Sequence, residues 1–271
     1  MYDIDQGMDG EPGCAAALPG SPWERRRREL HRIFARIEPH YDRLNRILSL
    51  GLDRRWREWT ARSIEVEGPW LDLASGTGDL AVHLYRRRRS ARSRPVLIRS
   101  DRVPGLLPLG MRKLAVPGHS PADSPGLGCE MDHLPFADRS LGGIVQGFAL
   151  RHCRDYSEFF AELHRVLRPG GQIAIMDMRY PRGRGLAIYR FYFRVLLPRV
   201  AVLLGGDREA YWFLVESVRS MPDESVLIAA MGEAGFSCIE SRPGFLGSVR
   251  LLRARRPAAL AGAAGGAYSA D

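Results

Sequence analysis

Lysine is almost absent from this chain of 271 residues. Lys113 is the only one among 40 basic side chains, so the formal charge of +9 and the pI near 9.9 come almost entirely from arginine. Arginine runs at 25–28 and 86–89 could attract RNA or an anionic lipid surface, although solvated helix faces and loops use such runs as well. The basic balance alone therefore does not identify a partner.

Cysteine is also scarce, and its spacing excludes the common cysteine-based sites. The four cysteines, Cys14, Cys129, Cys153 and Cys238, are far apart and form no CxxC pair. The sequence therefore indicates neither a zinc site nor a disulfide framework, and we expect no metal. A reducing cytoplasm fits this pattern.

Long apolar runs are missing too. No run reaches the roughly 18 apolar residues that span a bilayer. Residues 1–20 carry four acidic side chains where a secretory signal needs a basic start and an apolar centre. We therefore expect a cytoplasmic protein. At this length the chain can bury the core of one domain, which we place at 23–256, between disordered tails at 1–22 and 257–271.

Strand and helix signals alternate along the chain. Runs typical of strands occur at 70–73, 96–99, 127–131, 143–147, 172–178, 236–240 and 247–253. Helix-like spacing begins at Gly78 and recurs at 106–114, 156–167, 208–218 and 222–234, with a Pro-Gly-Gly turn at 169–171. This alternation predicts parallel pairing through right-handed crossovers. The expected fold is a doubly wound, Rossmann-like α/β sheet of seven strands.

Two helical additions accompany this sheet. Helices expected at 24–49 and 54–63 form an N-terminal cap over 23–66, and a helical lid insert over 182–220 precedes the last helix. Within the insert, 186–204 places Arg190 and Arg194 one helical turn apart among apolar and aromatic side chains. Such a segment can cover an isoprenoid tunnel, rest on the inner face of a membrane with its arginines in the interface, or pack on the core as an ordinary helix.

The stretch WLDLASGTGDLA at 70–81 breaks from an apolar strand into glycine where a helix should begin. Glycines at such a turn let the backbone approach a ligand beyond the carboxyl ends of the strands. The spacing of Gly76, Gly78 and Ala81, with Asp101 after the next strand, also satisfies the dinucleotide fingerprint. The turn alone therefore leaves NAD(P) and S-adenosylmethionine open.

Two acidic residues favour S-adenosylmethionine. Asp72 lies inside the first strand, where its carboxylate can reach the ammonium of a methionine-type ligand, whereas a dinucleotide offers no cation there. Asp79 lies against the N-terminus of the next helix. A second acid is awkward there beside a pyrophosphate but harmless beside a neutral or cationic cofactor.

Six stretches carry a resemblance to a known family. They are YDRLNRILSLGLDRRWR from residue 41, LDLASGTGDL from 71, LPFAD from 134, GFALRHCRD from 147, LHRVLRPGG from 163 and MPD from 221. In their order and spacing, from about 34 to 253, the chain resembles the ubiquinone/menaquinone biosynthesis C-methyltransferase family. These are class I S-adenosylmethionine-dependent methyltransferases of the demethylmenaquinone methyltransferase type.

The resemblance implies a role for each matched residue. Asp101 would hold both ribose hydroxyls, Glu130 and Met131 would flank the adenine, and Tyr41 would close over the cofactor from the cap. The expected cofactor-binding residues are Asp72, Ala74, Gly76, Thr77, Gly78, Asp101, Arg102, Glu130, Met131 and Gly147. Glu130 departs from the family, whose members usually have Asp or Asn at that position.

The expected reaction methylates a ring carbon of a quinol or phenol, most simply demethylmenaquinol to menaquinol or the ubiquinone-pathway equivalent. A ring carbon becomes nucleophilic when a neighbouring hydroxyl gives up its proton. We assign to Arg151 the electrostatic stabilisation of the phenolate, because arginine stays protonated. His152, which replaces the family's usual asparagine, could be the base. The expected catalytic residues are Arg151, His152 and Tyr41.

Several alternatives stay open at this point. The acceptor could be another phenolic natural product or a small lipid, and an NAD(P)-dependent oxidoreductase would use the same turn. A non-catalytic binding module is favoured by Pro104 and Pro108, which crowd the helix after Asp101. The stretch QGFALRH lacks the motifs of amino or cytosine-carbon methylation, so we expect no nucleic acid partner. Homodimer formation is left open.

Overall fold

A computed structural model describes residues 32, 41–90, 96–115, 123–180, 187, 191–192, 208–244 and 247–258. The expected tails lie almost wholly outside these residues. The greater part of the expected insert, including nearly all of 186–204, also lies outside these residues. The proposals that 186–204 contacts a membrane or forms a lid therefore stay predictions. None of the helices in the described ranges is long and apolar enough to cross a membrane.

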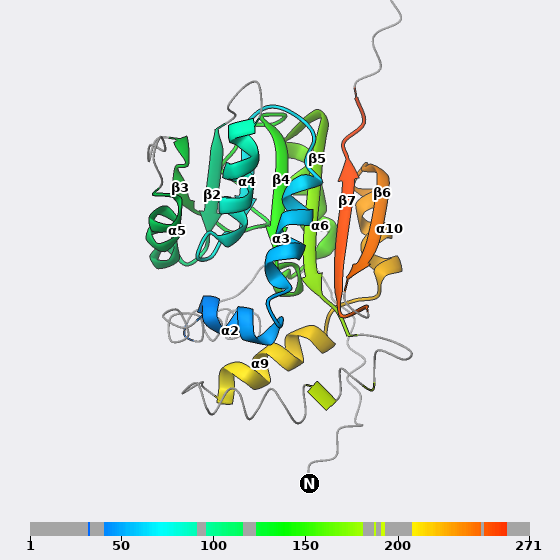
Figure 1. The fold of residues 1–271 in the computed structure, drawn as a ribbon. Helices are drawn as coiled ribbons and strands as arrows, with labels where there is room; N and C mark the ends of the chain where they lie inside the picture. The colour runs from blue at the N-terminus through cyan, green and yellow to red at the C-terminus, as the bar shows by residue number, and fades with distance from the viewer. Residues whose placement is uncertain are drawn as a thin grey trace, which may run out of the picture.

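The centre of the fold is a seven-stranded sheet with the order β3-β2-β1-β4-β5-β7-β6 (Figure 1). The strands are β1 (Trp70–Leu73), β2 (Leu97–Asp101), β3 (Gly126–Gly128), β4 (Leu141–Gly147), β5 (Leu167–Met178), β6 (Ser237–Gly244) and β7 (Val249–Arg255). β1 to β5 pair in parallel, as the alternation predicts. The doubly wound α/β sheet of seven strands is therefore confirmed.

The last two strands depart from parallel pairing. β7 lies between β5 and β6 and is antiparallel to both. Only a few residues separate β6 from β7, and a parallel pair needs a crossover of a dozen residues or more. The short connection therefore forces the chain to turn back on itself.

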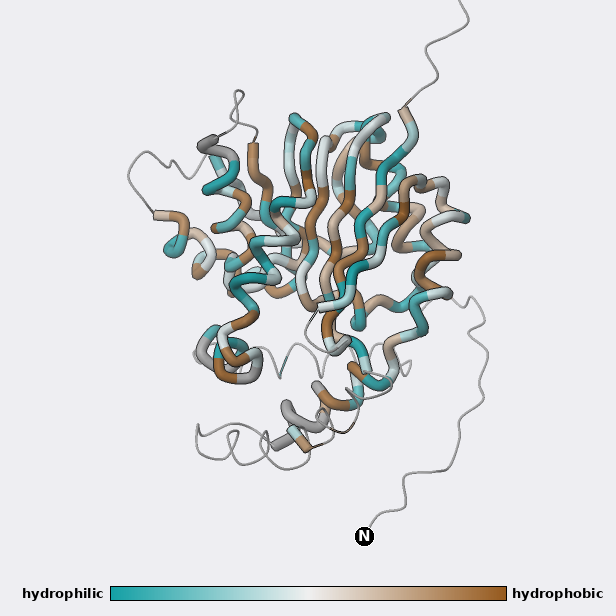
Figure 2. The backbone as a smooth tube through the Cα atoms, turned by 45° about the vertical axis from the view of Figure 1, so that its right-hand side comes forward, coloured by the Kyte–Doolittle hydropathy of each residue, from teal (hydrophilic) through white to brown (hydrophobic). Residues whose placement is uncertain are grey.

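Helices cover both faces of the sheet and enclose two apolar clusters. The helices of the described ranges include α2 (Tyr41–Leu48), α3 (Asp53–Arg62), α4 (Asp79–Ser90), α5 (Leu107–Leu114), α6 (Tyr156–Val166), α9 (Arg208–Arg219) and α10 (Glu224–Glu233), with the 3₁₀ turns η2 (Pro104–Leu106) and η4 (Leu150–His152). One cluster packs α6 and α10 against the sheet, and the other packs α3, α4 and α5 on its opposite face. Figure 2 shows the apolar residues concentrated along the central strands.

The Pro-Gly-Gly stretch at 169–171 is not the separate turn that the sequence predicts. β5 begins at Leu167 and runs through these residues, with a shift of register against β4 before Gln172. Gly170 has a φ of +78° and its amide donates to the carbonyl of Arg256, while the Arg256 amide donates to Gly171. The chain beyond β7 thus holds these residues as an irregular strand segment, so the prediction of a turn was wrong.

The carboxyl ends of β1, β2, β4 and β5 meet at one edge of the sheet, because these strands are parallel neighbours. Figure 1 shows α2 and α9 beyond this edge, below the sheet. Ligands of doubly wound sheets bind at this edge. The candidate site is therefore sought there.

Candidate functional site

The turn between β1 and α4 is built on left-handed backbone conformations. Ala74, Gly76 and Gly78 have φ values of +53°, +54° and +80°. A Cβ on Gly78 would lie 2.6 Å from the Cα of Gly110 on α5, so this position needs glycine both for its φ and for the close approach of two backbones. The predicted glycine turn is therefore present, and its chain path leaves no room for a side chain at Gly78.

Asp72 lies under this turn with its carboxylate unsatisfied. The residue is 1% exposed, and neither carboxylate oxygen has a hydrogen-bond partner among the described residues. Burial raises the pKa of Asp72 from 3.8 to about 7, although the charge of Arg57, the nearby backbone amide of Ala81 and the charge of Arg99 all lower it. A buried polar group without a partner is costly. The carboxylate is therefore suited to a cationic group of a ligand, as the sequence predicts.

Asp101 ends β2 beside the same turn. Its Oδ2 accepts the Gly76 amide at 2.7 Å and its Oδ1 accepts the Val103 amide at 2.8 Å. A carboxylate at the carboxyl end of this strand is the kind of group that accepts hydrogen bonds from ribose hydroxyls. The two amides fix the carboxylate in place for that contact.

The remaining residues predicted for the cofactor follow the same edge. Arg102 and Glu130 form an ion pair at 3.5 Å, and the Met131 sulfur accepts the side-chain amide of Gln146 at 3.5 Å. Gly147 ends β4, and a Cβ there would come within 3.1 Å of the Met176 methyl. The residues predicted from β1, β2 and the 130–131 loop are thus brought together with the end of β4.

Thr77 contacts two residues that the sequence motifs did not predict. Its hydroxyl donates to Asp42 of α2 at 2.5 Å and accepts from Lys113 of α5 at 3.0 Å. Asp79 also binds the Lys113 ammonium at 2.6 Å. The glycine turn is therefore connected to the cap and to α5 through charged side chains.

Arg151 is held in η4, directly after β4, by an acid of β5. Asp177 accepts the Arg151 amide at 2.9 Å and the Arg151 Nη1 at 2.6 Å, and Nη1 also donates to the Phe148 carbonyl at 2.6 Å. Arg151 is 8% exposed, and its Nε has no hydrogen-bond partner within the described ranges. No sequence motif predicted Asp177. An acid at the carboxyl end of the neighbouring strand was the available signal.

The structure gives fewer contacts for the other two residues that the sequence predicts for catalysis. His152 is half-buried and stacks on Phe213 of α9, with 5.7 Å between the ring centres and 17° between the ring planes. Tyr41 begins α2, but its side chain is outside what the structure describes. Their catalytic roles stay predictions.

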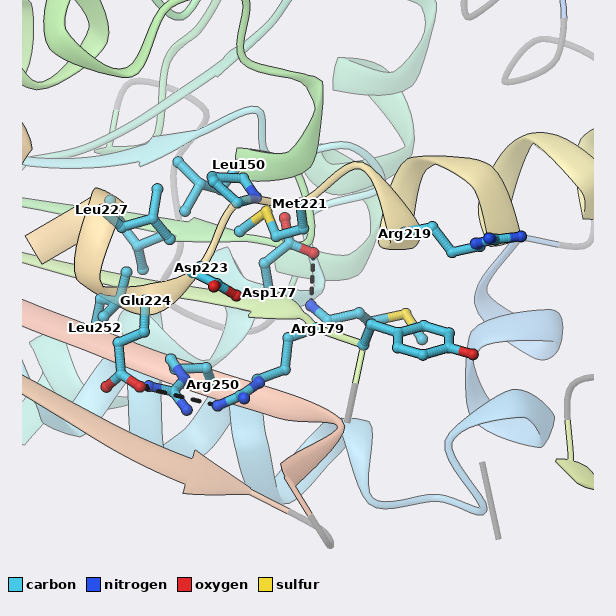
Figure 3. A pocket seen from close by; sticks show the side chains of 14 residues that line it. Leu150, Asp177, Arg179, Arg219, Met221, Asp223, Glu224, Leu227, Arg250 and Leu252 are labelled. Carbon is cyan, nitrogen blue, oxygen red and sulfur yellow. Dashed lines mark hydrogen bonds and ion pairs between the residues drawn. The ribbon is translucent and has the colours of Figure 1, made fainter. Parts of the chain in front are cut away.

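A pocket of about 380 Å³ has Asp177, the partner of Arg151, in its lining (Figure 3). It lies among the end of β5, the connection from α9 to α10, and β7. Its apolar lining comes from Leu150, Ile175, Met221, Leu227 and Leu252. Its charged lining includes Asp177, Arg179, Arg219, Glu224 and Arg250, with Glu224 paired to Arg250 and, at 3.9 Å, to Arg179. The volume lies within the range of roughly 300–1,000 Å³ that is common for small-molecule sites.

These features fit S-adenosylmethionine better than a dinucleotide. A buried carboxylate whose oxygens have no hydrogen-bond partner in the described ranges suits an ammonium, and two backbone amides fix a second carboxylate at the end of β2. A pyrophosphate would instead face Asp79 at the first position of α4. The charge at the turn therefore favours a cationic ligand.

Comparison with known proteins decides the family. Residues 23–249 match the model of the ubiE/COQ5 methyltransferase family. The chain belongs to this family. The NAD(P)-dependent oxidoreductase and the non-catalytic module are thereby set aside, and the protein is an S-adenosylmethionine-dependent methyltransferase, as the sequence predicts.

Individual relatives agree with the family match. The chain is 37% identical to the demethylmenaquinone methyltransferase of Deinococcus radiodurans over 208 residues, which cover 75% of this chain and 83% of that protein. It is 34% identical to the ubiquinone/menaquinone biosynthesis C-methyltransferase UbiE of Geotalea daltonii over 212 residues, which cover 77% of this chain and 88% of that protein. An S-adenosylmethionine-dependent methyltransferase from Thermotoga maritima has a similar fold, with a TM-score of 0.55, 14% identity, and coverage of 83% and 98% of the two chains.

Proposed function

We propose that this methyltransferase transfers the methyl group of S-adenosylmethionine to a ring carbon of a quinol, converting demethylmenaquinol to menaquinol or performing the equivalent step on a ubiquinone precursor. The family match over 23–249 carries the proposal, and relatives named for demethylmenaquinone methylation support it. The site residues add the chemistry that such a transfer needs.

The donor side of the site is the edge formed by β1, β2 and β4. Asp72 would pair with the ammonium of the cofactor, and Asp101 would accept from its ribose hydroxyls. Glu130 and Met131 would flank the adenine. When bound, S-adenosylmethionine supplies an electrophilic methyl group on a sulfonium. The residues of this edge hold and orient it, and alignment of this kind is a large part of catalysis by positioning.

The acceptor side needs a group that stabilises a phenolate. When a ring hydroxyl gives up its proton, electron density moves to the adjacent carbon. The new carbon–carbon bond forms there, and that carbon then loses its hydrogen as a proton. The buried Nε of Arg151 is a charged donor without a partner among the described residues, and it would bind the phenolate oxygen. Asp177 fixes the guanidinium for this contact.

The acceptor ring would lie in the pocket beside the Arg151–Asp177 pair. Its apolar lining suits the ring, and its arginines and acids suit the two hydroxyls (Figure 3). A small quinone-like acceptor agrees with the relatives. Contact with a membrane through 186–204, a cytoplasmic location and homodimer formation remain predictions.

The test is a methylation assay with purified protein, S-adenosylmethionine and chemically reduced demethylmenaquinone with a short side chain. The expected product is heavier by one methyl group, attached to carbon. The same assay with the oxidised quinone is the control, because a quinone has no hydroxyl to ionise. Methylation only of phenols that are not quinols, or only on oxygen, would contradict the proposal.

A further inference from the structure

The only lysine of the chain lies where the cap, the glycine turn and α5 meet. The Lys113 ammonium is 2.5 Å from a carboxylate oxygen of Asp42 on α2 and 2.6 Å from one of Asp79 on α4, and it donates to the Thr77 hydroxyl at 3.0 Å. A lysine ammonium has three N–H donors. The ammonium thus contacts three oxygen-bearing side chains, each from a different part of the site.

Thr77 closes this arrangement. Its hydroxyl donates to the Oδ1 of Asp42 at 2.5 Å, while the Oδ2 of Asp42 binds Lys113. Both carboxylate oxygens of Asp42 are thus used to hold α2 on the glycine turn. Charge-assisted hydrogen bonds of this length are among the stronger ones in proteins.

Backbone packing sets the position of Lys113. Gly110 lies three residues earlier on α5, hence on the same face of the helix. It approaches Gly78 so closely that a Cβ on Gly78 would be 2.6 Å from its Cα. α5 therefore lies directly against the turn, and the Lys113 side chain crosses it to reach α2.

The neighbouring arginines do not replace this lysine. Arg57 is 4.0 Å from Asp79, and Arg46 is 3.9 Å from Asp53, both longer than the contacts of Lys113. A guanidinium is a planar fork that suits one carboxylate, whereas an ammonium is a compact charge that can face three acceptors. Although burial opposes ionisation, Arg57 and Lys113 lower the pKa of Asp79. Lys113 therefore faces an ionised carboxylate at neutral pH.

We propose that Lys113 is a positioning residue that latches α2 onto the glycine turn and so covers the methionine end of the cofactor site. The inference rests on the cofactor of the proposed function. With the latch intact, Asp42 and Thr77 stay together over the turn. Without the ammonium, Asp42 loses its charged partner, α2 separates from the turn and the cofactor dissociates faster.

The first test measures the Kd for S-adenosylhomocysteine by calorimetry. Lys113→Met should raise the Kd at least about tenfold, which corresponds to 1.4 kcal/mol, and should raise KM for S-adenosylmethionine more than it lowers kcat. Arg112→Met is the matched control, because it removes the same charge from the adjacent exposed residue, and it should stay within about twofold. Asp42→Asn should reproduce the loss, and the double variant should be no weaker than either single variant. Additive losses, or a Kd for Lys113→Met within about twofold of wild type, would overturn the proposal.

The second test uses the fact that the chain has one lysine. Reductive methylation can modify only the Lys113 ammonium and the α-amine of the chain, and peptide mass spectrometry reports the two rates separately. S-adenosylhomocysteine should slow modification of Lys113 at least about fivefold relative to the α-amine, and Asp42→Asn should accelerate it in the ligand-free protein. Unchanged Lys113 rates in the Asp42→Asn protein would overturn the latch, even if Lys113→Met does not fold. If wild type binds no S-adenosylhomocysteine, the cofactor assignment fails, and the ligand-free comparison still decides the latch.

Discussion

Replacing Asp72 by asparagine should stabilise the protein while destroying its cofactor site. The carboxylate is 1% exposed and has no hydrogen-bond partner in the described part of the chain, so ionising it in the folded state is costly. Burial raises its pKa from 3.8 to about 7. The folded state therefore binds a proton between these two pH values that the unfolded state has released, and the free energy of unfolding falls as the pH rises through this range.

The size of the effect follows from the two pKa values. At 1.36 kcal/mol per pH unit, the raised pKa of Asp72 costs the folded state about 4 kcal/mol at pH 8, where the group is ionised, and about 2 kcal/mol at pH 5.5, where it holds its proton. An asparagine amide is also desolvated at this position and does not titrate. The gain from Asp72→Asn should therefore be about 2 kcal/mol larger at pH 8 than at pH 5.5.

Urea unfolding followed by tryptophan fluorescence at the two pH values measures this difference. Glu67→Gln, which changes an exposed carboxylate, is the control and should give no gain at either pH. The Kd of wild type for S-adenosylhomocysteine should rise up to tenfold per unit as the pH falls below 7, because the ligand's ammonium needs the ionised carboxylate. An equal gain in stability at both pH values would refute the reasoning, since it would mean that Asp72 does not titrate between them.

Two further substitutions test the backbone of the turn and the buried ion pair. Gly78→Ala should lower the free energy of unfolding by about 2–3 kcal/mol in urea titrations, because its Cβ would meet Gly110 and its φ is +80°; Gly76→Ala, which has open space, should cost about 1 kcal/mol. Asp177→Asn leaves the Arg151 guanidinium buried without a counter-charge. Asp177→Asn should lower the free energy of unfolding by about 3 kcal/mol. It should also lower kcat by about 100-fold or more, while the Kd for S-adenosylhomocysteine changes less than about threefold. Equal losses in kcat and affinity would argue against a role on the acceptor side.

The features that the sequence predicted well depend on residues close together in the chain. The strand at 70–73, the glycine turn and the start of α4 form one continuous stretch, so periodicity and turn chemistry specify them directly. The position of Asp72 beside the turn was predicted for the same reason, because its place in the strand fixes its distance from the turn. The prediction that Asp101 lies beside the turn needed only the rule that the carboxyl ends of parallel strands lie at one edge of the sheet.

The features that were missed depend on pairs far apart in the chain. Lys113 binds residues 34–71 positions away, and Asp177 is 26 positions from Arg151. Strand order decides which of these side chains meet, and periodicity carries no information on strand order. The prediction of a turn at the Pro-Gly-Gly stretch was wrong for a related reason. Its local chemistry predicts a turn, but amide contacts with Arg256 beyond β7 hold it as part of β5.

Four carboxylates at the sheet edge are buried or half-buried, and they differ in their partners. This difference helps to distinguish residues that would bind the cofactor from residues that would accelerate the reaction. Lys113 binds Asp79, backbone amides bind Asp101 and Arg151 binds Asp177, whereas the oxygens of Asp72 have no hydrogen-bond partner in the described ranges. The ammonium that Asp72 would pair with is present before and after methyl transfer. An interaction of equal strength in the ground and transition states lowers KM without raising kcat. The gain in rate must therefore come from groups that meet charge only as the reaction proceeds. In the proposed mechanism that group is Arg151, because the phenolate would develop beside its buried guanidinium.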